Sequence, residues 1–237
     1  MSNYILGYAI AGLGTLTETF TPEVRSMIIK GIFETLYMSL VSTALGYVIG
    51  LPWGIVLAVS DKDGIKPNSG LYKILDFIVN ILRSIPFLIL LILIIPLTRF
   101  IVGKSYGPTA TIVPLVVSCA PFIARLVESS LKEVDKGVIE AAQSMGASVW
   151  NIITKVMLVE ASVSLIVGAT ITFGNVLAYT AMAGTVGGGG LGDIAVRYGY
   201  YRWQADIMFI TVILLIVLVQ LFQFIGTKIS VLIDKRA

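Results

Sequence analysis

Histidine is absent from this 237-residue sequence, and cysteine occurs once, at Cys119. Without imidazole or paired thiolate ligands a transition-metal site is not expected, and one cysteine cannot build a disulfide framework. Charge is scarce as well, since 13% of the residues are charged and 57% are hydrophobic. A soluble domain of this length needs far more charged surface, so the composition predicts an integral membrane protein. The net charge of +3 is too small and too scattered to predict nucleic-acid binding.

Nucleotide-binding motifs are missing too. No G-x-x-x-x-G-K-[ST] segment occurs, so the chain has no P-loop for a nucleoside triphosphate, and energy for any work must come from another subunit. The segment GGGGLGD at 187–193 satisfies G-x-G-x-x-G, but no βαβ unit surrounds it. Its last four residues spell the G-x-G-D of intramembrane aspartyl proteases, which need a second carboxylate close by. Asp76 is the one membrane-adjacent partner and should lie near the opposite face, so a flexible external turn is favoured and the protease is a distant alternative.

Five apolar stretches are long enough to cross a hydrocarbon layer about 30 Å thick, which takes about 20 residues per helix. They lie near 31–59, 72–102, 109–127, 156–182 and 205–225. The second contains Pro86 and Pro96 and is too long for a straight crossing, so we expect it to bend or to extend beyond the membrane. Ahead of the first, Thr21 and Pro22 are typical of a helix N-cap and first helical position. Residues 1–20 are interpreted as a short interfacial segment.

The distribution of Lys and Arg over the short loops predicts the orientation, because cytoplasmic loops carry the excess. One side holds ten of these residues and the other side six, and Arg83 lies within a span. We therefore expect the N-terminus outside and the C-terminus in the cytoplasm. The richer side holds Lys62, Lys66, Lys73, Arg125, Lys132, Lys136, Lys155, Lys228, Lys235 and Arg236; the other holds Arg25, Lys30, Arg99, Lys104, Arg197 and Arg202.

A polar stripe within the second span needs a physical reason, because lipid penalises buried polar groups. Asp76, Asn80 and Arg83 recur at helical spacing, with Lys73 one turn before them. The stripe should face protein or a watery cavity near the cytoplasmic side. It is either a salt-bridged structural face or part of a transport pathway.

The fourth span also carries polar residues, Asn175 and Tyr179, for which the same two interpretations hold. Met182 follows at the external end of this span. A flexible thioether can close an apolar path and yield when helices part, so Met182 is a candidate gate. Packing against a neighbouring helix is the alternative.

The segment EAAQSMGASVW, residues 140–150, is polar and helical in pattern although apolar runs flank it. The predicted orientation places it in the cytoplasm. Asp135 can cap a short helix through Glu140, Gly146 can supply the left-handed turn that ends it, and Ser148 can cap a second helix. Small side chains then give a low surface that suits insertion into a groove of another protein, although an ordinary helical hairpin is the alternative. The residues of this surface are Ala141, Ala142, Gly146 and Ala147.

This segment resembles the EAA loop of bacterial ABC importer permeases, in which EAA is followed by three residues, Gly, nine residues and I-x-L-P. Glu140, Gly146 and Leu158 match at that spacing, whereas Val156 and Val159 replace the isoleucine and the proline. From about Glu23 to the C-terminus the chain is similar to the methionine-importer branch of these permeases. The supporting stretches are FETLYMSLVSTALGYVIGLPWG, LYKILDFIVNILRSIPF, PLTRFIVG, APFIARLVE, VDKGVIEAAQSMGAS and AMAGTVGGGGLGD.

The resemblance implies an all-α integral membrane protein of five transmembrane helices with a cytoplasmic coupling-helix hairpin, the type I ABC importer permease fold. The permease domain would span 21–237, with the EAA loop at about 129–155. The resemblance further implies no enzyme activity in this chain, and ATP and Mg bound by a partner subunit. The implied assembly, in the bacterial cell membrane and its lipid, is a homodimer with two ATP-binding cassette subunits and an extracytoplasmic methionine-binding protein.

The substrate that the resemblance implies is L-methionine, with tolerance for D-methionine. Another amino acid or a short peptide is the alternative cargo. The Glu140 to Ala147 surface would then be the link to the ATPase, and alternating access would be the mechanism.

Overall fold

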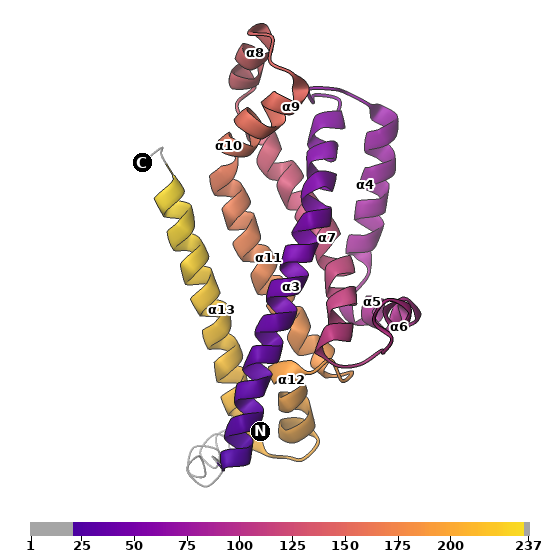
Figure 1. Ribbon diagram of the computed structural model, residues 1–237, viewed down its shortest axis with the longest axis vertical. Helices are drawn as coiled ribbons and strands as arrows, with labels where there is room; N and C mark the ends of the chain where they lie inside the picture. Colours follow the sequence, from indigo (N-terminus) through magenta and orange to yellow (C-terminus); the bar gives the residue numbers. More distant parts are fainter. Residues whose placement is uncertain (1–20, 235–237) are drawn as a thin grey trace, which may run out of the picture. The chain divides into compact units, whose positions relative to one another are not determined.

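The computed structural model describes residues 21–234, so the predicted interfacial segment 1–20 lies outside the described residues (Figure 1). All regular elements between 21 and 234 are helical. The chain divides into two compact units. One contains the described residues up to 41 with 87–115 and 175–221, and the other contains 42–86, 116–174 and the described residues from 222.

Four helices are long and apolar enough to cross a membrane, and a broken pair supplies a fifth span if it is counted as one. The four are α3 (Pro22–Ser60), α7 (Pro108–Lys132), α11 (Ser162–Gly184) and α13 (Ala205–Ile233). The pair is α4 (Ser69–Ser84) with α5 (Phe87–Leu93). The shorter elements are α6 (Ile95–Val102), α8 (Lys136–Ser144), α9 (Val149–Asn151), the π-helix η1 (Ile152–Met157), α10 (Leu158–Glu160), α12 (Gly190–Ile194) and the π-helix η2 (Ala195–Tyr200).

These helices confirm the predicted all-α membrane fold and the bend expected in the second stretch, and they differ from the prediction in where the fourth stretch starts. The second predicted stretch is interrupted at Ile85, which has extended backbone (φ −82°, ψ 122°) because Pro86 follows it. The fourth stretch was expected to start near residue 156. Its long helix begins only at Ser162, because the chain first forms η1 and α10 and then leaves α-helical geometry at Ala161.

The start of α3 follows the predicted capping pattern. The Val24 amide donates to Thr21 Oγ1 (3.3 Å), and Pro22 occupies the first helical position, where its missing N–H leaves no bond unmade. The helix continues for 39 residues, or about 58 Å at 1.5 Å per residue. It is therefore much longer than a hydrocarbon core of about 30 Å.

In the second unit α3 packs against α7 along a row of glycines at every fourth position, Gly46, Gly50 and Gly54. A Cβ placed on Gly50 would lie 2.5 Å from the Ala120 carbonyl oxygen and 2.8 Å from Ile123 Cβ. The backbones of the two helices therefore approach to a distance that only glycine permits, as small residues at i and i+4 predict. Gly174 differs, because its Cβ would meet nothing nearer than Gln223 Nε2 at 3.9 Å.

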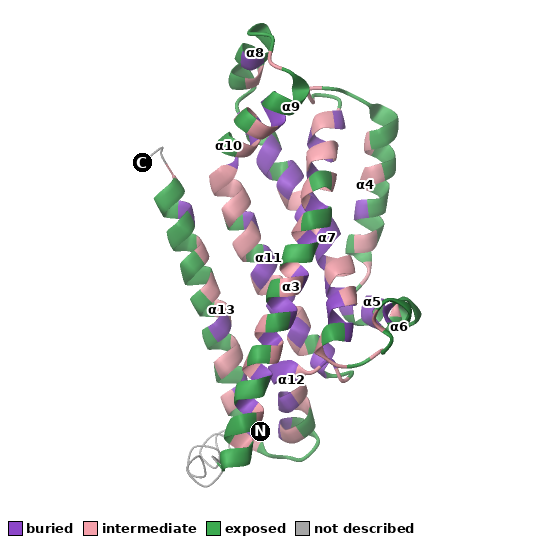
Figure 2. Cartoon of the chain, in the orientation of Figure 1, coloured by how far each residue is buried: buried purple, intermediate pink, exposed green. Residues whose placement is uncertain are grey.

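Helix α4 adds a second contact in this unit, through one apolar face. Val79 is fully buried and packs with Leu57 of α3 and Ala124 of α7. Partly buried Trp53, Tyr72 and Leu75 surround this core. The opposite face of α4 is exposed (Figure 2), as expected for a helix whose outer side meets lipid.

Candidate functional site

Helix α8, which carries the EAA residues, begins at the predicted cap. Asp135 Oδ1 accepts hydrogen bonds from the amides of Gly137 (2.8 Å) and Val138 (3.3 Å). Both amides belong to the first turn, where they have no partner within the helix. The carboxylate also lies favourably at the positive end of the helix dipole. The start of α8 is thus determined locally by the sequence.

The end of α8 is a Schellman turn built on Gly146. This residue has φ +77°, the left-handed region that favours glycine. The Ala147 amide donates to the Ala142 carbonyl (3.1 Å), and the Gly146 amide donates to the Gln143 carbonyl (2.9 Å). A Cβ on Gly146 would meet no atom of this chain within 4 Å. A larger side chain here would therefore be strained in its backbone and would not clash within the chain.

The second helix of the hairpin starts at its predicted cap as well. Ser148 Oγ accepts from the Asn151 amide (3.3 Å), and α9 continues directly into η1. Ile152 and Ile153 turn inward and are buried. The Trp150 indole points outward and is 72% exposed.

Much of the hairpin around α8 and α9 is exposed (Figure 2). Glu140, Ala141 and Gly146 are exposed and Ala147 is partly exposed, whereas Ala142 is buried. Ala142 thus packs inward and adds no area to the predicted low surface. Sequence reasoning did not single out Met145, which is 81% exposed, or Trp150, although exposed methionine and tryptophan are typical of protein contacts.

A cleft of about 300 Å³ lies between the loop after α3, the end of α7 and the inner side of α8. Its lining includes apolar Leu131, Ile139 and Met157 together with Lys132 and Glu140. Glu140 is therefore both on the exposed face of α8 and at the rim of a recess. The cleft was not predicted, because it is formed by three segments that are separate in the sequence.

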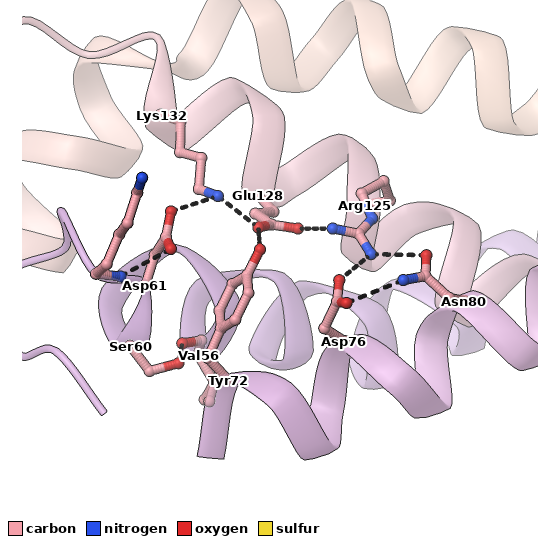
Figure 3. Close-up of polar contacts among 10 residues, drawn as sticks. Val56, Ser60, Asp61, Tyr72, Asp76, Asn80, Arg125, Glu128 and Lys132 are labelled. Atoms are coloured by element: carbon pink, nitrogen blue, oxygen red, sulfur yellow. Dashed lines mark hydrogen bonds and ion pairs between the residues drawn. The ribbon is translucent and has the colours of Figure 1, made fainter. Parts of the chain in front are cut away.

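A network of charged side chains joins α4 to α7 next to this cleft (Figure 3). Arg125 Nη2 donates to Asp76 Oδ1 (2.5 Å) and to Asn80 Oδ1 (2.9 Å), and Arg125 Nη1 donates to Glu128 Oε2 (2.6 Å). Asn80 Nδ2 in turn donates to Asp76 Oδ2 (3.0 Å). These four side chains therefore satisfy one another, and Glu128 is the buried member among them.

The network continues to the end of α3 through Lys132. Lys132 Nζ lies 2.7 Å from both Glu128 Oε1 and Asp61 Oδ2, and the Tyr72 hydroxyl donates to Glu128 Oε1 (3.1 Å). The hydrogen bond from Lys132 lowers the pKa of the Asp61 carboxyl, and the hydrogen bond from the Lys62 amide acts in the same direction. Glu128, with its side chain only 3% exposed, lies at the centre.

The predicted stripe on the second span is divided by the structure. Asp76 and Asn80 face α7 and are bonded to Arg125, whereas Arg83 is exposed and, among the described residues, forms no ion pair. Sequence reasoning missed Glu128 as the centre of the network. The available signal was the i, i+3 and i+7 spacing of Arg125, Glu128 and Lys132 at the end of an apolar helix.

The candidate gate residues belong to the first unit. The Tyr179 ring stacks on Phe87 with centroids 4.6 Å apart and planes 8° apart. Asn175 is partly buried, and Met182 is about half exposed. Met182 therefore has surface left for a contact outside this chain, and a gate role stays a prediction.

The glycine-rich segment 187–193, in which a flexible turn was expected, contains the start of α12, and the first two amides of this helix are hydrogen-bonded to α3. The Gly190 amide donates to Glu34 Oε2 and the Leu191 amide donates to Thr35 Oγ1, both at 2.9 Å. Asp193 of the G-x-G-D pattern is paired with Arg197 (2.7 Å). Asp76 is paired with an arginine as well, so both carboxylates of the protease alternative are engaged in ion pairs. Between residues 21 and 234 no cluster of three or more His, Cys, Asp or Glu could hold a metal ion.

Residues 50–237 match the family model described as the inner membrane component of binding-protein-dependent transport systems. The chain belongs to this family. Two relatives agree with the match across the length of the permease. The probable D-methionine transport system permease protein MetI of Vibrio cholerae is 48% identical over 89% of this chain and 93% of its own length. The methionine import system permease protein MetP of Bacillus subtilis is 46% identical over 86% of this chain and 92% of its own length.

Solved structures support the same fold. A chain of the MetNI methionine ABC transporter, solved in an inward-facing conformation, is 46% identical and has a TM-score of 0.90 over 91% of the permease and all of that chain. A chain of an amino acid ABC transporter solved with histidines has a TM-score of 0.72 at 19% identity, which extends the likeness in fold alone. The type I importer permease fold expected from the sequence is thus confirmed.

Proposed function

We propose that this permease imports methionine as the membrane-spanning subunit of an ATP-driven transporter. The observation that carries the proposal is the 46% identity and TM-score of 0.90 to a chain of the MetNI methionine ABC transporter. The relatives named as methionine permeases in two distant bacteria support the same substrate. D-methionine is proposed as a second cargo on the same grounds, and another amino acid or a short peptide is the alternative.

The proposed assembly has two permease chains, two ATP-binding subunits and an extracytoplasmic methionine-binding protein. Residues 21–237 form the permease domain, and the EAA loop at about 129–155 faces the cytoplasm. The exposed Glu140, Ala141 and Gly146, with Ala147 at their edge, would dock in a groove on the ATP-binding subunit. ATP and Mg would be held by that subunit, since this sequence has no P-loop.

The mechanism that fits this assembly is alternating access. ATP binding closes the ATP-binding subunits, and α8 conveys the movement so that the permease opens outward; release after hydrolysis returns it inward. A ligand shifts such an equilibrium only by its differential affinity for the two states. To convey the movement of the ATP-binding subunits, the hairpin has to be rigid. Its two side-chain caps and its glycine turn provide that rigidity.

The test is uptake of labelled amino acids into proteoliposomes that contain the permease, its ATP-binding subunit and its binding protein. ATP-dependent accumulation of methionine is expected, with an excess of unlabelled D-methionine reducing it. Uptake of a different class of amino acid would contradict the substrate and leave the permease role in place. Absence of any ATP-linked uptake in a fully assembled complex would contradict the function itself.

We further propose that Met182 closes the translocation path together with its counterpart in the second chain, and that Asn175 and Tyr179 line this path. The exposed half of Met182 and its position near the end of α11 support this assignment. Met182→Ala should raise the leak of methionine from loaded proteoliposomes in the absence of ATP. Ala178→Ser, which alters another exposed position on the same helix, is the control. An unchanged leak in Met182→Ala would favour simple packing.

A further inference from the structure

Five charged side chains at the cytoplasmic end of the second unit alternate in sign along one continuous chain (Figure 3). The order is Asp61, Lys132, Glu128, Arg125 and Asp76, and each neighbouring pair is joined at 2.5 to 2.7 Å. Asp61 follows the last residue of α3, Asp76 belongs to α4, and the other three belong to α7. This row of ion pairs thus links α4 and the end of α3 to α7.

Glu128 is the one member that joins the two ends of this chain. If its charge is removed, Lys132 still has Asp61 as a partner and Arg125 still has Asp76. No charge is then left alone, but the α3 end and the α4 end are no longer connected through ions. Substitution of Glu128 therefore leaves both outer pairs able to form, but removes the carboxylate that holds Arg125 and Lys132 of α7 in position to make them.

Apolar packing around Val79 holds α4 against α3 and α7, but hydrophobic attraction has no direction of its own. The ion pairs that leave α7 are those of Arg125 with Asp76 and of Lys132 with Asp61, and Glu128 pairs with both of these cations on its own helix. A shift of α4 or of the end of α3 against α7 would break a charge-assisted bond and leave a partly buried charge unpaired. The network is thus a device for register more than for stability.

The network ends only a few residues before α8, the helix that carries the EAA residues. Lys132 is the last residue of α7, and α8 begins at Lys136, only a short connection later. Within this connection Val134 is buried, which ties it to the body of the unit. A displacement of α8 can therefore pass to the end of α7 through this short connection.

We propose that Glu128 is a positioning residue that makes the cytoplasmic ends of α3, α4 and α7 move as one body when α8 is displaced. This role rests on the proposed function, because α8 transmits force only if an ATP-binding subunit holds it. Glu128 contacts neither substrate nor nucleotide. Its effect is on the fraction of ATP hydrolysis that is converted into transport.

The experiment measures methionine uptake, ATP hydrolysis and complex recovery in proteoliposomes with the complete transporter. Glu128→Gln should retain assembly and hydrolysis but lower uptake per ATP at least about fivefold, the lower end of the fold-changes typical of coupling between sites. Glu128→Asp keeps the charge on a side chain one methylene shorter and should recover part of the ratio. A purely structural role would instead lower recovery and hydrolysis together with uptake.

A second pair of variants tests the same role without touching the buried centre. Asp61→Asn breaks only the connection to α3, whereas Asp63→Asn makes the same chemical change two residues away, at an exposed side chain outside the network. Uptake per ATP should fall in Asp61→Asn and stay at the wild-type value in Asp63→Asn. Equal ratios in these two variants, or a wild-type ratio in Glu128→Gln, would overturn the role of Glu128.

The wild-type complex separates this inference from the proposed function. If it transports another amino acid in place of methionine, the substrate proposal fails and the ratio is measured with that amino acid. If it hydrolyses ATP without any uptake, the proposed function and the positioning role fall together.

Discussion

Asp61 shows how one ionisable side chain makes a local contact depend on pH. Its carboxylate accepts from Lys132 Nζ at 2.7 Å, and this bond lowers its pKa in the folded protein. A depressed pKa means that the pair contributes stability above the unfolded value of about 3.9 and that the contribution disappears as the pH falls through the folded value. The contribution is about 1 kcal/mol or less, because the Lys132 side chain is 39% exposed.

Thermal unfolding of the wild type and of Asp61→Asn between pH 7 and pH 3 measures this contribution. The wild type should be the more stable protein near neutrality, and the two curves should converge below about pH 4. Asp63→Asn, which changes an exposed carboxylate without an ion pair among the described residues, should follow the wild type throughout. A difference of the same size at every pH from 7 to 3 would show that Asp61 acts through packing and not through its charge.

Substitutions of Gly146 can distinguish backbone strain within the permease from a clash with a docked partner. A non-glycine residue at φ +77° is destabilised by about 1–2 kcal/mol, although asparagine tolerates this region better. Gly146→Ala and Gly146→Leu share this backbone strain, and the Cβ of either meets no atom of the chain within 4 Å. We therefore expect an additional effect of leucine to come from a surface that approaches from outside.

We therefore expect a graded series. Gly146→Asn should assemble and couple almost as the wild type, Gly146→Ala should lose a little, and Gly146→Leu should lose binding of the ATP-binding subunit or uptake per ATP. Glu140→Ala should act in the same direction but mildly, because an exposed charge-assisted bond contributes modestly. Recovery of the complex and the uptake ratio are the two measurements. Identical behaviour of the alanine and leucine variants would contradict docking at the end of α8.

At the scale of helices, the α3–α7 contact depends on the absence of side chains from its glycine row. A methyl group on Gly50 would be 2.5 Å from the Ala120 carbonyl oxygen, which belongs to helix backbone and cannot rotate away. Gly50→Ala should therefore destabilise the permease by about 1–3 kcal/mol, as overpacking does elsewhere. Gly174→Ala adds the same methyl group with its nearest neighbour at 3.9 Å and should be neutral or stabilising. Thermal unfolding of the purified permease compares the two, and equal midpoints would contradict the close approach of α3 and α7.

Elements determined by neighbouring residues were predicted well from the sequence. The caps at Thr21, Asp135 and Ser148 and the turn at Gly146 each depend on a side chain and amides within a few residues, so their patterns are readable. Likewise, the residue before Pro86 breaks the second span for a local steric reason.

The remaining features depend on contacts between segments that are far apart in the sequence. Arg125 and Asp76 are 49 residues apart, and no periodicity within either helix says that they meet. The fourth long helix was predicted to start near residue 156 but starts at Ser162, after η1 and α10. Apolar periodicity alone cannot distinguish a π-helix from an α-helix, so this boundary was not readable from the sequence. Burial of Ala142 was missed for the same reason, because the burial of a small residue on a short helix depends on how that helix packs against the rest of the chain.

At the scale of the whole molecule, the orientation in the membrane can be tested across a single span. Helix α7 has 25 residues, about 37 Å at 1.5 Å per residue, which is enough to cross a core of about 30 Å. Lys104 precedes this helix and Lys136 follows it, and both side chains are exposed. If α7 crosses the membrane, the two positions lie on opposite sides of it, and the excess of Lys and Arg on the Lys136 side predicts that this side is cytoplasmic.

Cysteine labelling of intact cells measures this directly. Lys104→Cys and Lys136→Cys are each introduced into a Cys119→Ser background, in which the buried native thiol no longer contributes. A membrane-impermeant maleimide should label position 104 in intact cells, and position 136 only after the cells are opened. Labelling of position 136 alone in intact cells would show that the chain is inverted and would remove the EAA helix from the side where ATP is hydrolysed. Labelling of both positions would contradict α7 as a span, because residues at the two ends of a crossing helix cannot face the same compartment.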